Sequence, residues 1–110
     1  MKKDLSVCDL LELYGSLLTM RQKEALTLYY EDDLSLAEIA ENRGISRQGV
    51  MELVRNGREQ LSRYEETLGL LKKKARLISQ IEQAEAEAER GDMSAVKRSL
   101  LIIKESMHGI

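Results

Sequence analysis

The residues best suited to binding chemistry gather around position 47. Arg47 and Gln48 stand where a helix is expected to begin, and Arg55 follows about two turns later. Arginine and glutamine can hydrogen-bond to the edges of guanine and adenine in the major groove of DNA. Arg43 and Arg58 could add contacts to phosphates. These residue types at this spacing favour nucleic-acid binding.

Catalysis has little support in the sequence. His108 is the single histidine and lies close to the last residue, and Cys8 is the single cysteine. We expect Cys8 to be a buried small apolar side chain, since no base is available to activate it. A Gly-rich phosphate loop and a Ser/His/Asp set are both missing. We therefore expect no enzyme activity and no cofactor. One cysteine also suits a reducing cytoplasm.

The segment 29–33 offers two further binding chemistries, and we expect neither to be used. Glu31, Asp32 and Asp33 could hold a metal, but acids in a turn without a calcium loop usually end a helix. Tyr29 and Tyr30 could stack on bases, but stacking platforms need several exposed aromatic rings. We expect one tyrosine in the core and the other half covering it. The sequence therefore predicts no metal site.

A helix-turn-helix unit is needed to position the arginines, and residues 36–54, LAEIAENRGISRQGVMELV, have its pattern. Ala40 is small enough for a close helix crossing, and Gly44 four residues later can adopt a positive φ. Ile45 would fill the gap between the helices, and Ser46 would cap the second helix. This spacing predicts a helix-turn-helix at about 35–58. Inward positions are Ile39, Ala40, Val50 and Leu53; outward positions are Arg47, Gln48, Met51, Glu52 and Arg55.

Cap residues and helical spacing divide residues 1–69 into four expected helices. Thr19 with Gln22, and Ser35 with Glu38, form capping boxes. The expected helices cover about 4–14, 20–30, 35–43 and 46–68. Expected core residues of the second helix are Ala25, Leu26, Leu28 and Tyr29. The fourth helix carries an apolar seam of Val50, Val54, Gly57, Leu61, Tyr64 and Leu68. Glycine in that seam indicates either a close backbone approach or a kink.

Residues 70–110 predict a helical hairpin, with helices at about 70–90 and from 93 onward, and Ser94 as a candidate cap. The facing positions are expected to be Leu70, Leu77, Ile81, Ala84 and Ala88 on one helix, and Met93, Val96, Leu100, Ile103 and Met107 on the other. The second helix has more apolar residues than one partner helix can cover. We therefore expect self-association, with a homodimer first. The expected interface residues are Leu61, Tyr64, Leu100, Ile103 and Met107.

Charge is unevenly distributed along the chain. Residues 1–69 carry 9 lysines and arginines against 13 acids, and residues 70–110 carry 8 against 6. A dedicated DNA-binding domain is usually basic, so the acidic first part weakens the case for DNA. Lys72, Lys73 and Lys74 form the dense basic run of the chain. They are either a solvated helix face or a phosphate or RNA contact.

The runs LTMRQKEALTLYYEDDLSLAEIAENRGISRQGV (18–50) and LSRYEETLGL (61–70) closely resemble the YlxM family of small bacterial helix-turn-helix proteins. The resemblance implies an all-α fold like region four of bacterial sigma factors, with a helical tail. It also implies a regulatory or accessory role in the signal recognition particle pathway, through contacts to the particle's protein or RNA. The matching positions are Tyr29, Tyr30, Asp32, Asp33, Ser35, Ile39, Ala40, Ser46, Arg47, Gln48 and Val50.

The sequence thus predicts a helix-turn-helix domain at 1–69 and a hairpin tail at 70–110. We expect a cytoplasmic, non-enzymatic accessory protein of the signal recognition particle pathway, with no membrane association. A processed leader is not expected, because acidic residues interrupt the first apolar stretch. Two alternatives remain open. One is a transcription regulator that places Arg47, Gln48 and Arg55 in the major groove, and the other is an oligomeric adaptor that binds protein through the tail.

Overall fold

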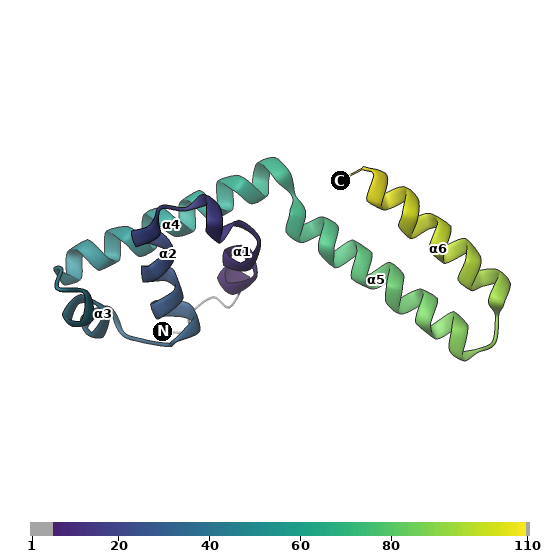
Figure 1. Cartoon of the computed structure of the whole chain (residues 1–110), viewed down its shortest axis with the longest axis horizontal. Coiled ribbons are helices and arrows are strands. Elements are labelled where there is room, and N and C mark those ends of the chain that lie inside the picture. Colours follow the sequence, from purple (N-terminus) through teal and green to yellow (C-terminus); the bar gives the residue numbers. More distant parts are fainter. Residues whose placement is uncertain (1–5, 110) are drawn as a thin grey trace. The chain divides into compact units, whose positions relative to one another are not determined.

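The computed structural model describes residues 6–109, and all regular structure in this range is helical (Figure 1). The expected all-α fold is confirmed. Residues 4 and 5, where the first helix was expected to begin, lie outside the described residues. The chain divides into two compact units, Met1–Gly69 and Leu70–Ile110. The first holds α1 (Ser6–Tyr14), η1 (Gly15–Leu17), α2 (Met20–Leu26), η2 (Thr27–Glu31), α3 (Leu36–Arg43) and α4 (Arg47–Leu68); the second holds α5 (Leu70–Glu89) and α6 (Met93–His108).

Capping side chains start the helices of the first unit as the sequence predicts. The backbone N–H of Gln22 donates to Thr19 Oγ1 at 3.2 Å, and the backbone N–H of Glu38 donates to Ser35 Oγ at 3.1 Å. In both cases the longer side chain accepts a hydrogen bond from the backbone N–H of the cap residue, so both capping boxes are confirmed. These bonds satisfy backbone donors that a helix start leaves open.

The second helix differs from its prediction as one α-helix over 20–30. α2 ends at Leu26, and the chain continues as the π-helical turn η2, where the Asp32 N–H reaches the Thr27 carbonyl at 3.0 Å. A π turn inserts an extra residue and so rotates the following side chains. Tyr30 is consequently the buried residue, with 5% of its surface exposed, whereas Leu28 and Tyr29 are half-buried. Their expected places in the core are corrected accordingly.

α4 forms the spine of the first unit. Its buried stripe faces α1, α2 and α3, which contribute the other large core residues. The helix runs unbroken through Gly57, which is buried beneath Leu26 of α2. Towards its end the expected seam loses its cover, since Tyr64 is half-buried and Leu68 is exposed. The largest fully buried side chains are Tyr14, Leu26, Ile39, Val50 and Leu61.

The second unit is an antiparallel hairpin of α5 and α6 (Figure 1). Gly91 takes a positive φ of 75° in the turn, and Asp92 caps α6 by accepting the Ala95 N–H at 3.1 Å. The cap is therefore Asp92 and not Ser94. Asp92 Oδ1 reaches the third residue of the helix, which is the usual span of a capping side chain.

The seam of the hairpin matches its prediction in part. Ala84 is buried as expected, and Leu70, Leu77, Val96 and Ile103 are half-buried, but small and polar side chains make the other close contacts. Ala84 and Ala95 are buried, the Ser99 hydroxyl hydrogen-bonds the Glu87 carboxylate, and Gln80 Nε2 donates to Ser106 Oγ at 3.3 Å. Small residues allow the two helices to approach closely, so the bulky positions are turned aside. Of the expected seam, Ile81, Ala88, Met93, Leu100 and Met107 are exposed.

Candidate nucleic-acid interface

The turn between α3 and α4 positions the candidate side chains. Gly44 adopts a left-handed φ of 67° and ends α3. The backbone N–H of Ile45 then donates to the Ala40 carbonyl at 3.1 Å. Ser46 then caps α4 by accepting the Gly49 N–H at 2.9 Å. The first turn of α4 therefore begins at Arg47 with its backbone direction set by both the glycine and the cap.

The five outward positions predicted on α4 are exposed in the structure. Gln48, Arg55 and Arg58 line one shallow groove, together with Met51 and the half-buried Tyr29. The structure thus brings three of the five candidates around position 47 to the same groove. Arg47 lines an adjoining depression that also touches Tyr29, so four candidates share this side of the unit.

Arg58 has a structural partner within this groove. Its Nη1 donates to the Tyr30 hydroxyl at 3.0 Å, while the Tyr30 ring is buried against Tyr29 with the ring centroids 5.0 Å apart. This hydrogen bond holds the guanidinium close to the protein surface and leaves its charge exposed to solvent. Arg58 is therefore suited to a phosphate contact near the surface, and less suited to reaching into a groove of DNA.

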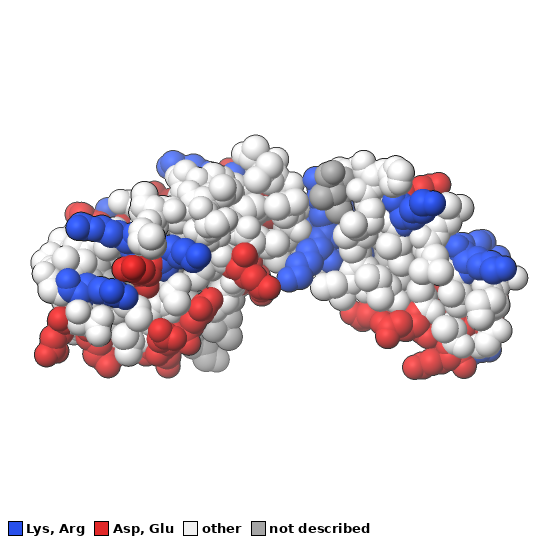
Figure 2. Space-filling model, viewed as in Figure 1, with Lys and Arg blue, Asp and Glu red and all other residues white. Residues whose placement is uncertain are grey.

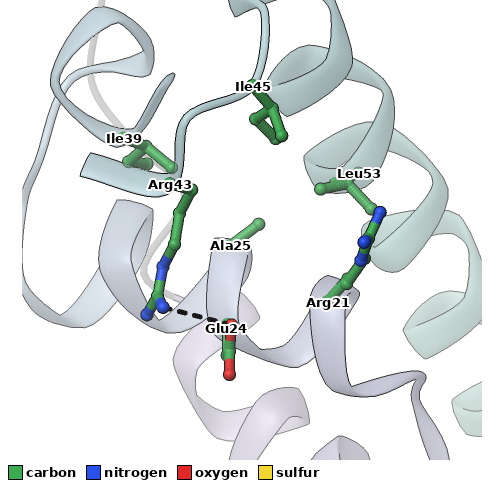
Figure 3. Close-up of a pocket in the computed structure, with 7 residues that line it drawn as sticks. All are labelled: Arg21, Glu24, Ala25, Ile39, Arg43, Ile45 and Leu53. Atoms are coloured by element: carbon green, nitrogen blue, oxygen red, sulfur yellow. Dashed lines mark ion pairs between the residues drawn. The ribbon is translucent and has the colours of Figure 1, made fainter. Parts of the chain in front are cut away.

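Arg43 lies apart from the other candidates. It lines a different pocket, of about 210 Å³, between α2, α3 and the start of α4 (Figure 3). Its guanidinium pairs with the Glu24 carboxylate at 3.5 Å, and Arg21 extends from α2 on the other side of the same pocket. Ile45, expected to close the gap between the helices, keeps 37% of its surface exposed at this pocket. Sequence reasoning missed Arg21, because its position depends on how α2 meets α4.

Acidic side chains surround the candidate cations. Glu52 lines the same groove as Arg55, and Asp33 and Glu38 line the depression beside Arg47. Figure 2 shows acidic groups along one edge of the first unit and a smaller basic group beside them. This arrangement supplies few phosphate contacts, so any affinity for nucleic acid would depend weakly on salt.

The lysine run belongs to the second unit. Gly69 has a left-handed φ of 60° and ends α4, so Lys72, Lys73 and Lys74 lie in the first turns of a separate helix. Lys72 and Lys74 are exposed, and Lys73 is half-buried beside Arg76 in a depression on the hairpin. The run is therefore a compact basic patch at one end of the hairpin.

The expected interface residues fall into two groups. Leu61 has no exposed surface, and the hydroxyl of the half-buried Tyr64 donates to the Leu17 carbonyl at 3.2 Å. Leu61 therefore cannot contact another chain, and its expected place in the interface is wrong, whereas the place of Tyr64 there stays a prediction. Leu100 and Met107 are about half exposed on the hairpin, and Ile103 is half-buried between them and the seam.

The described residues hold neither a cluster arranged for a metal ion nor a helix able to span a membrane. Between residues 6 and 109, no group of three or more His, Cys, Asp or Glu side chains is arranged to hold a metal ion. Cys8, expected to be buried, is half-buried, with its thiol 3.9 Å from the Tyr30 carbonyl. Among the same residues, no helix has the length and apolar character needed to cross a membrane.

Comparison with known proteins places the chain in a family. Residues 1–98 match the family described as "Putative helix-turn-helix protein, YlxM / p13 like". A UPF0122 protein of Symbiobacterium thermophilum is 38% identical over 104 residues, covering 94% of this chain and 97% of the relative. A UPF0122 protein of Acetivibrio thermocellus is 56% identical over 64 residues, which cover 58% of this chain and 55% of the relative. A UPF0122 protein of Bacillus cereus strain AH187 is 43% identical over 83 residues, which cover 73% of this chain and 76% of the relative. The chain therefore belongs to the YlxM-like UPF0122 family of helix-turn-helix proteins.

Proposed function

We propose that this chain is a non-enzymatic regulatory protein that acts by binding nucleic acid through the start of α4. The observation that carries the proposal is the exposure of Arg47, Gln48 and Arg55 directly after the Gly44 turn. In helix-turn-helix proteins this segment enters the major groove, and its first side chains read the base edges. The proposal also suits the family, which is one of helix-turn-helix proteins.

The electrostatics set the strength of binding that we expect. Arg43 is paired with Glu24, so the cations available at this surface are mainly Arg47, Arg55 and Arg58. The positive end of the α4 dipole adds a favourable site for a phosphate. Few phosphate contacts mean modest affinity, and a shallow fall in affinity with salt, with a slope of about −3 on logarithmic axes for three contacts.

The test is a binding titration with duplex DNA and with structured RNA from the host, at several salt concentrations. Arg47→Ala and Gln48→Ala should each weaken binding by about tenfold, as expected for loss of one base contact. Arg63→Ala is the matched control, because Arg63 is also an exposed arginine of α4 but lies far along the helix. Unchanged binding in all three variants would remove α4 from the interface.

The signal recognition particle pathway is the specific setting that we propose for this activity, on the strength of family membership. Its ligand would be the RNA or the protein of the particle, and the cytoplasm would be its location. The basic patch of Lys72, Lys73 and Lys74 favours an RNA contact, because clustered lysines at a helix start suit closely spaced phosphates.

Pull-down from the host cytosol, with and without nuclease, tests this setting. Recovery of particle components that is lost after nuclease treatment would support the RNA contact, and a Lys72–Lys74 triple alanine variant should abolish it. Arg63, Arg90 and Arg98, all exposed and outside both proposed interfaces, form a control of equal charge when changed together to alanine. If neither variant recovers less of the particle and nuclease has no effect, the RNA contact is wrong and a protein contact remains.

A further inference from the structure

Five large apolar side chains on the hairpin are exposed, and four of them (Ile81, Met93, Leu100 and Met107) occupy positions that were expected to face the other helix. Each keeps between 45% and 60% of its surface exposed. A hairpin that displays this many bulky groups gains stability if another surface covers them. We call these residues the hairpin face: Ile78, Ile81, Met93, Leu100 and Met107.

Ile81, Leu100 and Met107 lie on one side of the hairpin, and the exposed Glu85, four residues after Ile81, lies on the same side. Ile81 directly follows Gln80 of the seam, and Leu100 and Met107 directly follow Ser99 and Ser106 of the seam. One residue is a rotation of 100° in an α-helix. Because the helices are antiparallel, the same rotation brings both rows to the same side. Figure 2 shows this side, with uncharged side chains spread over both helices.

Opposite charges border the face on its two edges. Glu82 and Glu89, seven residues apart, lie beside the row on α5, and Lys97 and Lys104, also seven apart, lie beside the row on α6. All four are exposed. In Figure 2 acidic groups follow the outer edge of α5 and basic groups follow that of α6. One chain thus carries both halves of a complementary pattern.

Hydrogen bonds in the seam set the register of these charges. Glu87 meets Ser99 and Gln80 meets Ser106, so each step forward on α5 corresponds to one step back on α6. Two residues after Glu87 on α5 and two before Ser99 on α6, Glu89 is level with Lys97. In the same way, Glu82 is level with Lys104, because they lie two residues after Gln80 and two before Ser106. The acidic and basic edges therefore match in height along the hairpin.

We propose that a second copy of this chain covers the hairpin face and that the two hairpins form an antiparallel four-helix bundle. A two-fold axis parallel to the helices would place α5 of each copy on α6 of the other. Glu89 and Glu82 of one copy then meet Lys97 and Lys104 of the second copy, four pairs in all. The other face-to-face arrangement, α5 on α5, would set acid against acid.

The seam gives a reason why the hairpin needs this cover. Ala84 and Ala95 are its buried apolar residues, and Gln80 Oε1 is buried without a hydrogen-bond partner among the described residues. Alanines bury little apolar surface, and an unsatisfied buried oxygen costs stability. In the bundle the stripe that includes Ile81, Leu100 and Met107 becomes the common core, as helix bundles require.

Sedimentation equilibrium of the full chain at tens of micromolar tests the proposal. We expect a mass of twice the 12.5 kDa of one chain. Leu100→Asp should raise the dimer dissociation constant by at least about a hundredfold, because a symmetric interface carries the change twice. Ile102→Asp is the matched control, since Ile102 is 51% exposed on the opposite side of α6. A monomeric wild-type chain, or equal effects of the two variants, overturns the proposal.

A charge exchange tests the arrangement independently of apolar packing. Lys97→Glu should weaken the dimer by roughly tenfold, and adding Glu89→Lys should restore it, because the exchange recreates the pair in the opposite sense. Arg98→Glu is the control, as Arg98 neighbours Lys97 but points away from the face. Far-UV circular dichroism checks that every variant remains helical. A double variant no tighter than Lys97→Glu alone refutes the proposed pairing.

Discussion

The side chain of Leu26 lies directly over Gly57, where a β-carbon on the glycine would come within 2.7 Å of Leu26 Cδ1 and 3.3 Å of Cγ. Leu26 is fully buried, so it has little room to move aside. The sequence indicated either a backbone approach or a kink at Gly57. The structure shows a third solution, in which a side chain of α2 packs on an unbroken α4.

Gly57→Ala should lower the free energy of unfolding by about 1 kcal/mol. Alanine gains about 1 kcal/mol of helix propensity, but overpacking a filled core costs about 1–3 kcal/mol. Urea denaturation followed by circular dichroism, at one fixed protein concentration, measures the difference. A variant more stable than the wild type would mean that Leu26 yields easily.

The same contact predicts coupling between the two positions. In a Leu26→Ala background, which is itself destabilised by about 2–5 kcal/mol, Gly57→Ala should become neutral or stabilising. The reason is that the shortened side chain no longer meets the added methyl group. A double-mutant cycle by urea denaturation gives the coupling energy, and additive effects would show that the two residues do not share the space.

Gly44→Ala should destabilise the protein by about 1 kcal/mol through its backbone alone. The φ of 67° disfavours an L side chain, yet no atom lies within 4 Å of the position that a β-carbon would take. Gly44→Asn should cost less, because asparagine tolerates the left-handed conformation. Thermal unfolding of the three proteins provides the comparison. Equal losses for alanine and asparagine would point to a steric cause.

The pairing of Arg43 with Glu24 predicts a difference between two exposed arginines. Arg43→Ala should change nucleic-acid affinity by less than about twofold, because an arginine already paired with a carboxylate contributes little to a phosphate contact. Arg55→Ala should weaken nucleic-acid affinity several-fold. Fluorescence anisotropy at low salt is the measurement. Glu24→Gln, which frees Arg43, should raise affinity; a fall would contradict this account.

The buried pair in the hairpin should respond differently to single and double changes. Ser99→Ala leaves the buried Glu87 carboxylate without the hydroxyl that donates to it, so we expect a loss of about 1–3 kcal/mol. Replacing both, as Glu87→Leu with Ser99→Ala, should recover that loss through apolar packing. Urea unfolding at one fixed protein concentration compares the single and the double variant. A double variant with a lower free energy of unfolding than Ser99→Ala would contradict the prediction.

Short-range chemistry in the sequence determined where α2, α3 and α4 start and the frame of the candidate site. Thr19, Ser35 and Ser46 predicted helix starts, and Gly44 predicted a turn, because caps and left-handed residues act within a few positions. The exposure of Arg47 and Gln48 followed from the same local pattern. The sequence alone also identified the family, through runs longer than any single motif.

Only the tertiary structure decided which faces meet. The π turn at η2 exchanged Tyr29 for Tyr30 in the core, and the approach of α2 to α3 drew Arg43 to Glu24. In the hairpin, the small residues Ala95 and Ser99 lie in the seam, and Leu100 is turned outward. A periodic pattern marks an apolar stripe, but the closeness of helix packing determines which residues beside that stripe are enclosed.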